Sequence, residues 1–489
     1  YVASAGLQFL LVLVVTHGLS GTAAGVFFEA VALFSILSQW GELGADTGAV
    51  REVSRLRAVG RSGDIPAALI AALVPVVAFG LLALVLVYGF APALAEAFFR
   101  SADHGEAVGY LRLFAVFLPV ASACTVILAA TRGFGTMRAY VAVQNIALPA
   151  VRPLLVGGAL VAGLGSFAVG LAWALPLAFA LLGALGLLHG RLRGLGESAS
   201  GPQPVSRTSR AIAAEFWHFA GPRCLAGVFG VTVTWLDVLL VGAYTSSRNA
   251  AIYAAASRLS VVGTYALYAM GMALAPQFSR LLAARDLDRV QTLYQMSTWW
   301  IMALCWPLYV AFAVYGHTLM AMFGAGYASG GGALLILALG GLVNLGTGNC
   351  TVVLLMSGYS SWNMFNAGLS LVVNVGLNLI LIPRLGIAGA AIAWAASITV
   401  NNLAAVLQVR MLLGVRPFGR AYVRIAGAAV LIYGGLGALI RWQTAGSVLG
   451  FVAFCLVASA LYLWLLWRDR DSLQLTELGR SLRRASAAV

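Results

Sequence analysis

Long apolar runs alternate with short polar loops along the whole chain. A helix needs about 20 mostly apolar residues to cross a membrane, because each residue rises about 1.5 Å against roughly 30 Å of hydrocarbon. Fourteen runs approach this length, near 2–19, 25–44, 67–90, 111–131, 140–163, 168–188, 219–243, 250–274, 298–315, 332–355, 364–382, 388–409, 425–440 and 447–467. The pattern therefore predicts an all-α polytopic membrane protein with about 14 transmembrane helices. Because the first run starts at Tyr1 without a basic leader, we expect the native chain to begin further upstream.

The composition excludes several classes of protein. Of the 489 residues, 61% are hydrophobic and only 9% are charged. A soluble domain carries about 25% charged residues, so this chain lacks the polar residues to cover a water-facing surface. Soluble enzymes, nucleic-acid binders and disordered scaffolds are therefore excluded.

The net charge of +14 comes from 30 basic residues, all of them arginine. Twenty-two of these arginines fall in loops on one side of the predicted membrane and five fall on the other side. Short cytoplasmic loops hold the excess of basic residues. This asymmetry predicts that both termini are cytoplasmic, and the dispersal of the arginines gives no reason to expect a nucleic-acid partner.

No feature of the sequence points to a cofactor or to catalysis. The five cysteines stand singly and form no C-x-x-C pair, so neither a disulfide framework nor a metal site is indicated. No nucleotide-binding glycine loop is present, and ATP is not implied. A membrane-embedded glycosyltransferase or polymerase is disfavoured, since the longest outer loop, 91–110, offers only Glu96, Arg100, Asp103 and Glu106.

Two segments of the first half recur in the second half. Residues 19–27 match residues 245–253 at an offset of 226, and Leu164-Gly165 with Ala172-Trp173-Ala174 recur at an offset of 221. Six spans separate equivalent points, so the repeats are parallel, and parallel repeats are typical of transporters with a substrate site between two lobes. The alternative is a duplication kept only for packing. We expect a six-helix lobe at 1–188, a linker at 189–215, a second six-helix lobe at 216–414, and two further helices with a basic tail at 415–489.

Four segments resemble one branch of a known superfamily. They are GELGADTGAVREVS (41–54), WLDVLLVGAYTSSRNAAIYAAASRL (235–259), MFGAGYASGGGALLILALGGLVN (322–344) and LLMSGYSSWNMFNAGLSLVVNVGLNLILIPRLGIAGAAIAWAAS (354–397). The chain resembles the polysaccharide-export, or O-unit flippase, branch of the multidrug/oligosaccharidyl-lipid/polysaccharide (MOP) flippase superfamily. The resemblance implies a V-shaped pair of six-helix lobes, as in the MATE transporters, in a bacterial plasma membrane. It also implies that the protein moves a polyprenyl-(pyro)phosphate-linked oligosaccharide from the inner to the outer leaflet by alternating access during cell-envelope polysaccharide biosynthesis.

The main alternative is a cation-coupled small-molecule or drug antiporter of the same superfamily. Drug exporters of this group usually carry an acidic residue in the first span, and residues 2–19 contain none. Lipid II flippases tend to place arginine there, which is also absent. These departures favour the oligosaccharide flippase. Its expected partners are membrane lipids, a coupling ion (H⁺ or Na⁺) or the membrane potential, and the glycan polymerase or glycosyltransferase machinery.

Arg152 is the deepest of the three arginines that lie within predicted spans. It lies about twelve residues into its span, or roughly 18 Å at ~1.5 Å per residue, which is too deep for the side chain to reach the interface. An ionisable residue inside a span marks a candidate functional site. Because a guanidinium suits phosphate geometry, we expect Arg152 to bind the phosphate of the carrier lipid. The alternative is that it caps carbonyls freed beside Pro149 and Pro153.

Four further ionisable residues are candidates. Asp237 and Arg258 lie at similar depth on adjacent predicted helices, so an ion pair is expected, either fixing the structure or coupling transport to a cation. Arg223 follows Gly221-Pro222 near the cytoplasmic end of its span, where it either snorkels or meets the headgroup. Glu29 lies about one turn inside the second span; we expect a snorkelling interfacial acid, with ion coupling as the alternative.

Asparagines are the remaining candidates for substrate binding. Asn145 accompanies Arg152 in the fifth span, and Asn374 and Asn378 stand one turn apart on one face of the eleventh. Amide side chains inside a membrane either hydrogen-bond a ligand, here sugar hydroxyls, or join helices to one another. The pattern alone does not decide between these roles.

Overall fold

The computed structural model describes residues 2–100, 104–198, 208–324 and 326–468. All regular elements in these ranges are helical. The α-helices are α1 (Val2–Gly18), α2 (Gly21–Gly41), α3 (Ala45–Ala58), α4 (Ile65–Gly89), α5 (Ala91–Phe98), α6 (His104–Arg132), α7 (Arg138–Tyr140), α8 (Leu148–Val161), α9 (Ser166–Ala174), α10 (Pro176–Ser198), α11 (Ser209–Tyr244), α12 (Ser247–Ala283), α13 (Leu287–Ala321), α14 (Gly331–Gly346), α15 (Cys350–Met356), α16 (Ser360–Leu385), α17 (Ile387–Leu413), α18 (Arg420–Ala429), α19 (Gly437–Gln443) and α20 (Val448–Arg468).

The predicted spans agree closely with these helices. Within the described residues, 13 helical stretches are long and apolar enough to cross a membrane. They match the last 13 predicted runs; the run at 67–90, for example, is α4. The first run forms α1, whose 17 residues cover about 26 Å at 1.5 Å per residue. The predicted fold class, all-α and polytopic, is confirmed.

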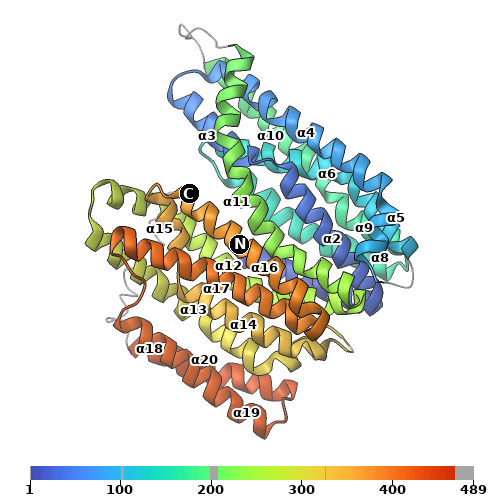
Figure 1. The fold of residues 1–489 in the computed structure, drawn as a ribbon, viewed down its shortest axis with the longest axis vertical. Coiled ribbons are helices and arrows are strands. Elements are labelled where there is room, and N and C mark those ends of the chain that lie inside the picture. Colours follow the sequence, from blue (N-terminus) through green and yellow to red (C-terminus); the bar gives the residue numbers. More distant parts are fainter. Residues whose placement is uncertain (1, 101–103, 199–207, 325, 469–489) are drawn as a thin grey trace. The chain divides into compact units, whose positions relative to one another are not determined.

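Packing divides the described part of the chain into two compact units, one within residues 3–254 and the other within residues 255–468. In the first unit, α6 is the most enclosed span and packs on α2, α4 and α10 (Figure 1). Helix α11 packs on α2, α3 and α4. This unit therefore extends beyond the predicted linker at 189–215 and ends inside α12. The predicted domain limits, which follow the internal repeat, stay predictions.

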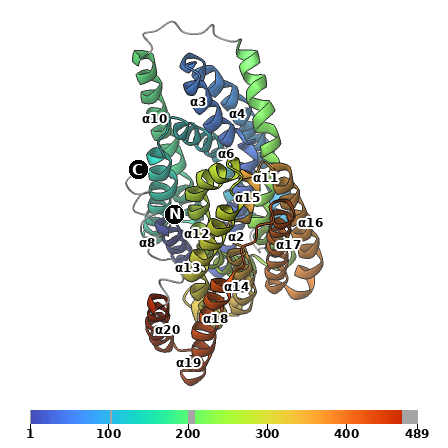
Figure 2. The ribbon, with the colours of Figure 1, turned by 90° about the vertical axis from the view of Figure 1, so that its left-hand side faces the viewer.

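The second unit is built around α13. Helix α13 packs on α14, and α16 pairs with α17, which also packs on α14 (Figure 2). A buried apolar cluster joins α12, α13, α15 and α17 through residues such as Phe278, Tyr294, Val353 and Val409. The C-terminal helices α18, α19 and α20 complete the unit, with α18 lying on α13.

Several spans are interrupted at places that position polar groups. A π-helical segment, Val141–Ala147, lies between α7 and α8, and such segments occur frequently at functional sites. Helix α9 ends at Ala174 and α10 begins at Pro176, which has no N–H to continue the helical hydrogen bonds. Gly348, with φ +60°, separates α14 from α15. The breaks at Pro176 and Gly348 end helices, and helix ends leave backbone groups without partners inside the helix.

Candidate functional site

Glu29 has the most completely buried carboxyl group inside a described span. Its exposed fraction is 0%, and the Ser247 hydroxyl donates a hydrogen bond of 3.0 Å to Oε2. The other carboxyl oxygen, Oε1, has no donor among the described residues. The prediction that Glu29 snorkels to the interface is therefore wrong. The reason is that α11 and the start of α12 cover this face of α2, so the side chain points into protein.

Two glycines make room for this contact. A Cβ on Gly242 of α11 would overlap the Glu29 carboxylate, and a Cβ on Gly25 of α2 would overlap the carbonyl of Ser247. The first turns of α2 and α12 are capped in the same way. Ser20 Oγ accepts a hydrogen bond from Ala23 N at the start of α2, and Ser246 Oγ accepts one from Asn249 N at the start of α12. The close approach of α2, α11 and the first turn of α12 therefore holds the Glu29 carboxyl in place.

Asp237 is a second buried carboxylate in the same unit. It is 1% exposed and accepts a hydrogen bond of 2.8 Å from the Tyr253 hydroxyl. Both residues lie within residues 3–254, whereas Arg258 is half-buried in the part of α12 that belongs to the second unit. The ion pair between Asp237 and Arg258 stays a prediction. Tyr253 is a partner that sequence reasoning missed.

Arg152 binds to another helix of its own unit. Its Nε donates to the Trp173 carbonyl at 3.1 Å, and its guanidinium carbon lies 4.1 Å from the centre of the Trp173 ring. This carbonyl lies in the last turn of α9, just before the break at Pro176. The structure thus shows Arg152 bound to a carbonyl of α9 rather than to a carbonyl beside Pro149 or Pro153. Its expected role in phosphate binding stays a prediction.

Trp173 also belongs to an aromatic cluster. Its ring packs against Phe27, Phe34 and Phe114 with centroid distances of 6.2, 5.4 and 5.0 Å. This cluster ties α9 to α2 and α6. Arg152 therefore lies over a rigid apolar platform, half-buried, and makes no hydrogen bond to Glu29 or Asn145 among the described residues.

The structure describes the side chain of Asn145 but not that of Arg223. Asn145 lies in the π-helical segment, is 8% exposed, and its Nδ2 has no acceptor among the described residues. A buried amide donor without a partner is costly, so Asn145 has spare capacity for a ligand, as does Asn349 of the second unit, whose Nδ2 also has no acceptor among the described residues. Arg223 lies in α11, but its side chain is outside the described part of the chain.

Asparagines of the second unit mostly bind one another. Asn378 Nδ2 donates to Asn374 Oδ1 at 3.1 Å, as their spacing of one turn suggests, and both are fully buried. Asn402 donates to Asn344 at 2.8 Å, which joins α17 to α14. Asn366 exchanges two hydrogen bonds with Gln408, which joins α16 to α17. These contacts favour helix joining for the long-range pairs.

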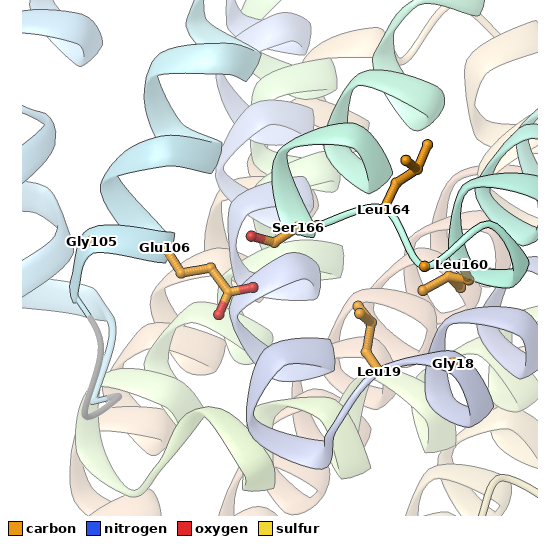
Figure 3. A pocket seen from close by; sticks show the side chains of 9 residues that line it. Gly18, Leu19, Gly105, Glu106, Leu160, Leu164 and Ser166 are labelled. Carbon is orange, nitrogen blue, oxygen red and sulfur yellow. The ribbon is translucent and has the colours of Figure 1, made fainter.

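A pocket of about 570 Å³ lies at one end of the first unit. It is lined by the end of α1, the start of α6 and the loop between α8 and α9 (Figure 3). The Glu106 carboxylate and the Ser166 hydroxyl point into it, beside the backbone of Gly163 and Gly165. Sequence reasoning counted Glu106 only as an outer-loop charge. The residues that line the pocket with Glu106 come from segments far apart in the sequence, so no local sequence pattern predicts the pocket.

Comparison with known proteins identifies relatives of both halves of the chain. A family model described as polysaccharide biosynthesis protein matches residues 1–282, and a model described as MatE matches residues 222–380. Two proteins of Haloferax volcanii are similar: the probable flippase AglR, 24% identical over 263 residues, and the probable low-salt glycan biosynthesis flippase Agl15, 24% identical over 214 residues. The matches cover 52% and 42% of this chain and 54% and 43% of those proteins. The chain thus spans about half the length of these relatives.

Solved structures show the same fold. The lipid II flippase MurJ in an inward closed conformation has a TM-score of 0.72 at 12% identity and covers 96% of this chain and 98% of its own. An inward-facing multidrug resistance MATE transporter has a TM-score of 0.67 at 15% identity and covers 84% and 94%. The family models and the two relatives confirm the resemblance predicted from the four sequence segments. Since the polysaccharide biosynthesis model matches more than half of its length, this multi-pass membrane protein belongs to the polysaccharide biosynthesis family of the MOP flippase superfamily.

Proposed function

We propose that the protein is a flippase, not an enzyme, that moves a polyprenyl-(pyro)phosphate-linked oligosaccharide from the inner to the outer leaflet during polysaccharide or cell-envelope glycan biosynthesis. The observation that carries this proposal is the family match over residues 1–282, in a chain that is similar to two proteins of Haloferax volcanii that are both named as probable flippases. The MurJ-like fold over 96% of the chain is consistent with it.

We assign the carrier-lipid phosphate to Arg152, with Arg223 and Arg258 as further cationic positions. The proposal for Arg152 rests on its half-buried guanidinium, which binds through Nε and stacks on Trp173. A guanidinium fixed in this way is preorganised for a phosphate oxygen. Asn145 and Asn374 are the proposed contacts for sugar hydroxyls. The Nδ2 of Asn145, which has no acceptor in the described ranges, supports the first of these.

We assign ion coupling to Glu29 and Asp237. Both carboxyl groups are buried in the first unit, and each accepts a hydrogen bond from a hydroxyl group. Buried carboxyl groups inside a membrane protein are characteristic of proton or cation relays. The two buried carboxyl groups also fit a second candidate function, a cation-coupled drug antiporter. The MatE match at residues 222–380 favours this second function.

Depletion of the protein from its native cell tests the function. A flippase predicts that lipid-linked glycan accumulates on the cytoplasmic leaflet while sugar transfer to the lipid stays intact. If the amount of lipid-linked glycan and its distribution between the leaflets do not change, the proposal is contradicted and the antiporter is favoured. Drug-resistance assays then test the antiporter. Loss of the lipid-linked sugar itself indicates an enzyme.

A further inference from the structure

An amphipathic groove lies between α12 and α13, in the second unit. Its volume is about 300 Å³. Leu274, Met296 and Trp300 form its buried floor, each less than 9% exposed. Arg289 and Thr292, both exposed, and the half-buried Gln277 line the part nearer the turn between the helices, together with the half-buried Leu281 and Leu293. The groove is therefore apolar at one end, and at the other it adds polar groups and one cation.

The polar end lies next to the turn between the two helices. Helix α12 ends at Ala283 and α13 begins at Leu287, so Arg289 is in the first turn of α13. The surrounding segment, 280–289, carries three arginines against two aspartates. The arginine distribution predicts that this turn faces the cytoplasm, where anionic lipid headgroups attract basic residues.

The guanidinium of Arg289 has hydrogen-bond donors available for a ligand. Its Nε lies 3.3 Å from Asp286 Oδ2, and its side chain is 78% exposed. Neither terminal nitrogen of the guanidinium makes a hydrogen bond to another described residue. These nitrogens can bind a phosphate in the bidentate manner that guanidinium groups favour, while Asp286 continues to orient Nε.

We propose that this groove binds an anionic membrane phospholipid. The lipid phosphate lies at Arg289 with Gln277 and Thr292, and the first carbons of one acyl chain lie on Leu274, Met296 and Trp300. The volume supports a phospholipid over the glycan-bearing substrate, since 300 Å³ is at the lower limit for a drug-sized ligand and is too small for an oligosaccharide. The proposal does not depend on which molecule the protein transports.

Native mass spectrometry of the full chain tests the proposal. The protein is reconstituted in nanodiscs of phosphatidylglycerol or of phosphatidylcholine, and the lipids retained after mild detergent release are counted. We expect retention of phosphatidylglycerol, and Arg289→Gln should weaken it about fivefold, the effect of one arginine near an anionic surface. The control Arg280→Gln removes an exposed arginine near the same turn that does not line the groove, and should retain lipid as the wild type does.

A second variant tests whether the lipid needs the open groove. Thr292 is exposed at the edge of the groove, so Thr292→Trp should fill the groove and reduce retention without disturbing the core. Thermal unfolding of each variant confirms that it is folded. Equal retention by Arg289→Gln and the wild type, or equal retention of the two lipids, overturns the proposal. Displacement of phosphatidylglycerol by undecaprenyl phosphate at an equal amount also overturns it and assigns the groove to the carrier lipid.

Discussion

At the scale of single residues, the enclosed site around Glu29 limits most strictly which side chains can replace those present. The carboxyl group is enclosed by α2, α11 and the start of α12, and one hydroxyl group donates to it. Replacement of its partners by larger or smaller groups therefore has predictable effects. These effects separate a role in packing from a role in ion coupling.

Gly242→Ala should destabilise the protein. The new methyl group would overlap the Glu29 carboxylate, and overpacking of this kind costs about 1–3 kcal/mol. Thermal unfolding in detergent measures the loss. Gly230→Ala, on the same helix, is the matched control, because a Cβ there meets no atom within 4 Å. The double variant Gly242→Ala/Glu29→Ala should recover part of the loss, and a purely additive result contradicts the proposed overlap.

Glu29→Gln should fold almost as well as the wild type, whereas Glu29→Ala should not. Glutamine keeps an oxygen that accepts from the Ser247 hydroxyl, while alanine leaves that hydroxyl without its acceptor, at a cost of about 1–3 kcal/mol. Unfolding measurements distinguish the two variants. If Glu29 carries the coupling proton, Glu29→Gln should nevertheless abolish transport. A folded Glu29→Gln protein with normal transport removes Glu29 from the coupling site.

At the scale of helices, Arg152 joins α8 to α9. We expect Arg152→Ala and Trp173→Leu each to destabilise the first unit, with a coupling free energy of about 1–2 kcal/mol in a double-mutant cycle, because the guanidinium stacks on a desolvated ring. Leu154→Ala, an exposed position on the same helix, serves as the control.

The same variants test the binding of phosphate. If Arg152 also receives the carrier lipid, Arg152→Ala should abolish glycan export, while Trp173→Leu, which keeps the guanidinium but removes the ring that orients it, should reduce export per folded molecule only in part. Equal export per folded molecule in both variants leaves Arg152 with a structural role alone.

The sequence predicted the elements better than their contacts. Apolar length alone places α4 or α20 within a few residues, because a span must match the thickness of the bilayer. The pair Asn374–Asn378 follows from helical spacing. By contrast, Asn344 and Asn402 are 58 positions apart, and no periodicity relates them. The burial of Glu29 could not be predicted for the same reason, because the two glycines that leave room for its contact lie on different helices, α2 and α11.

At the scale of the whole molecule, the distribution of arginines predicts that both termini are cytoplasmic. Alkaline phosphatase fused after Gly446, between α19 and α20, should be active, and the same enzyme fused after Arg416, between α17 and α18, should be inactive. A fluorescent-protein fusion with the opposite compartment requirement is the control. Activity at Arg416 with none at Gly446 contradicts the orientation, and with it the proposal that the groove at Arg289 faces the inner leaflet.

The two glycine contacts at the start of α12 also predict a pattern of variation among related sequences. The obstacle at Gly25 is a backbone carbonyl, which no substitution shortens, so glycine should persist there in every homologue that keeps this helix crossing. The obstacle at Gly242 is the end of a side chain. A larger residue at position 242 should therefore occur together with a shorter one at position 29, so that these two positions covary while position 25 does not change.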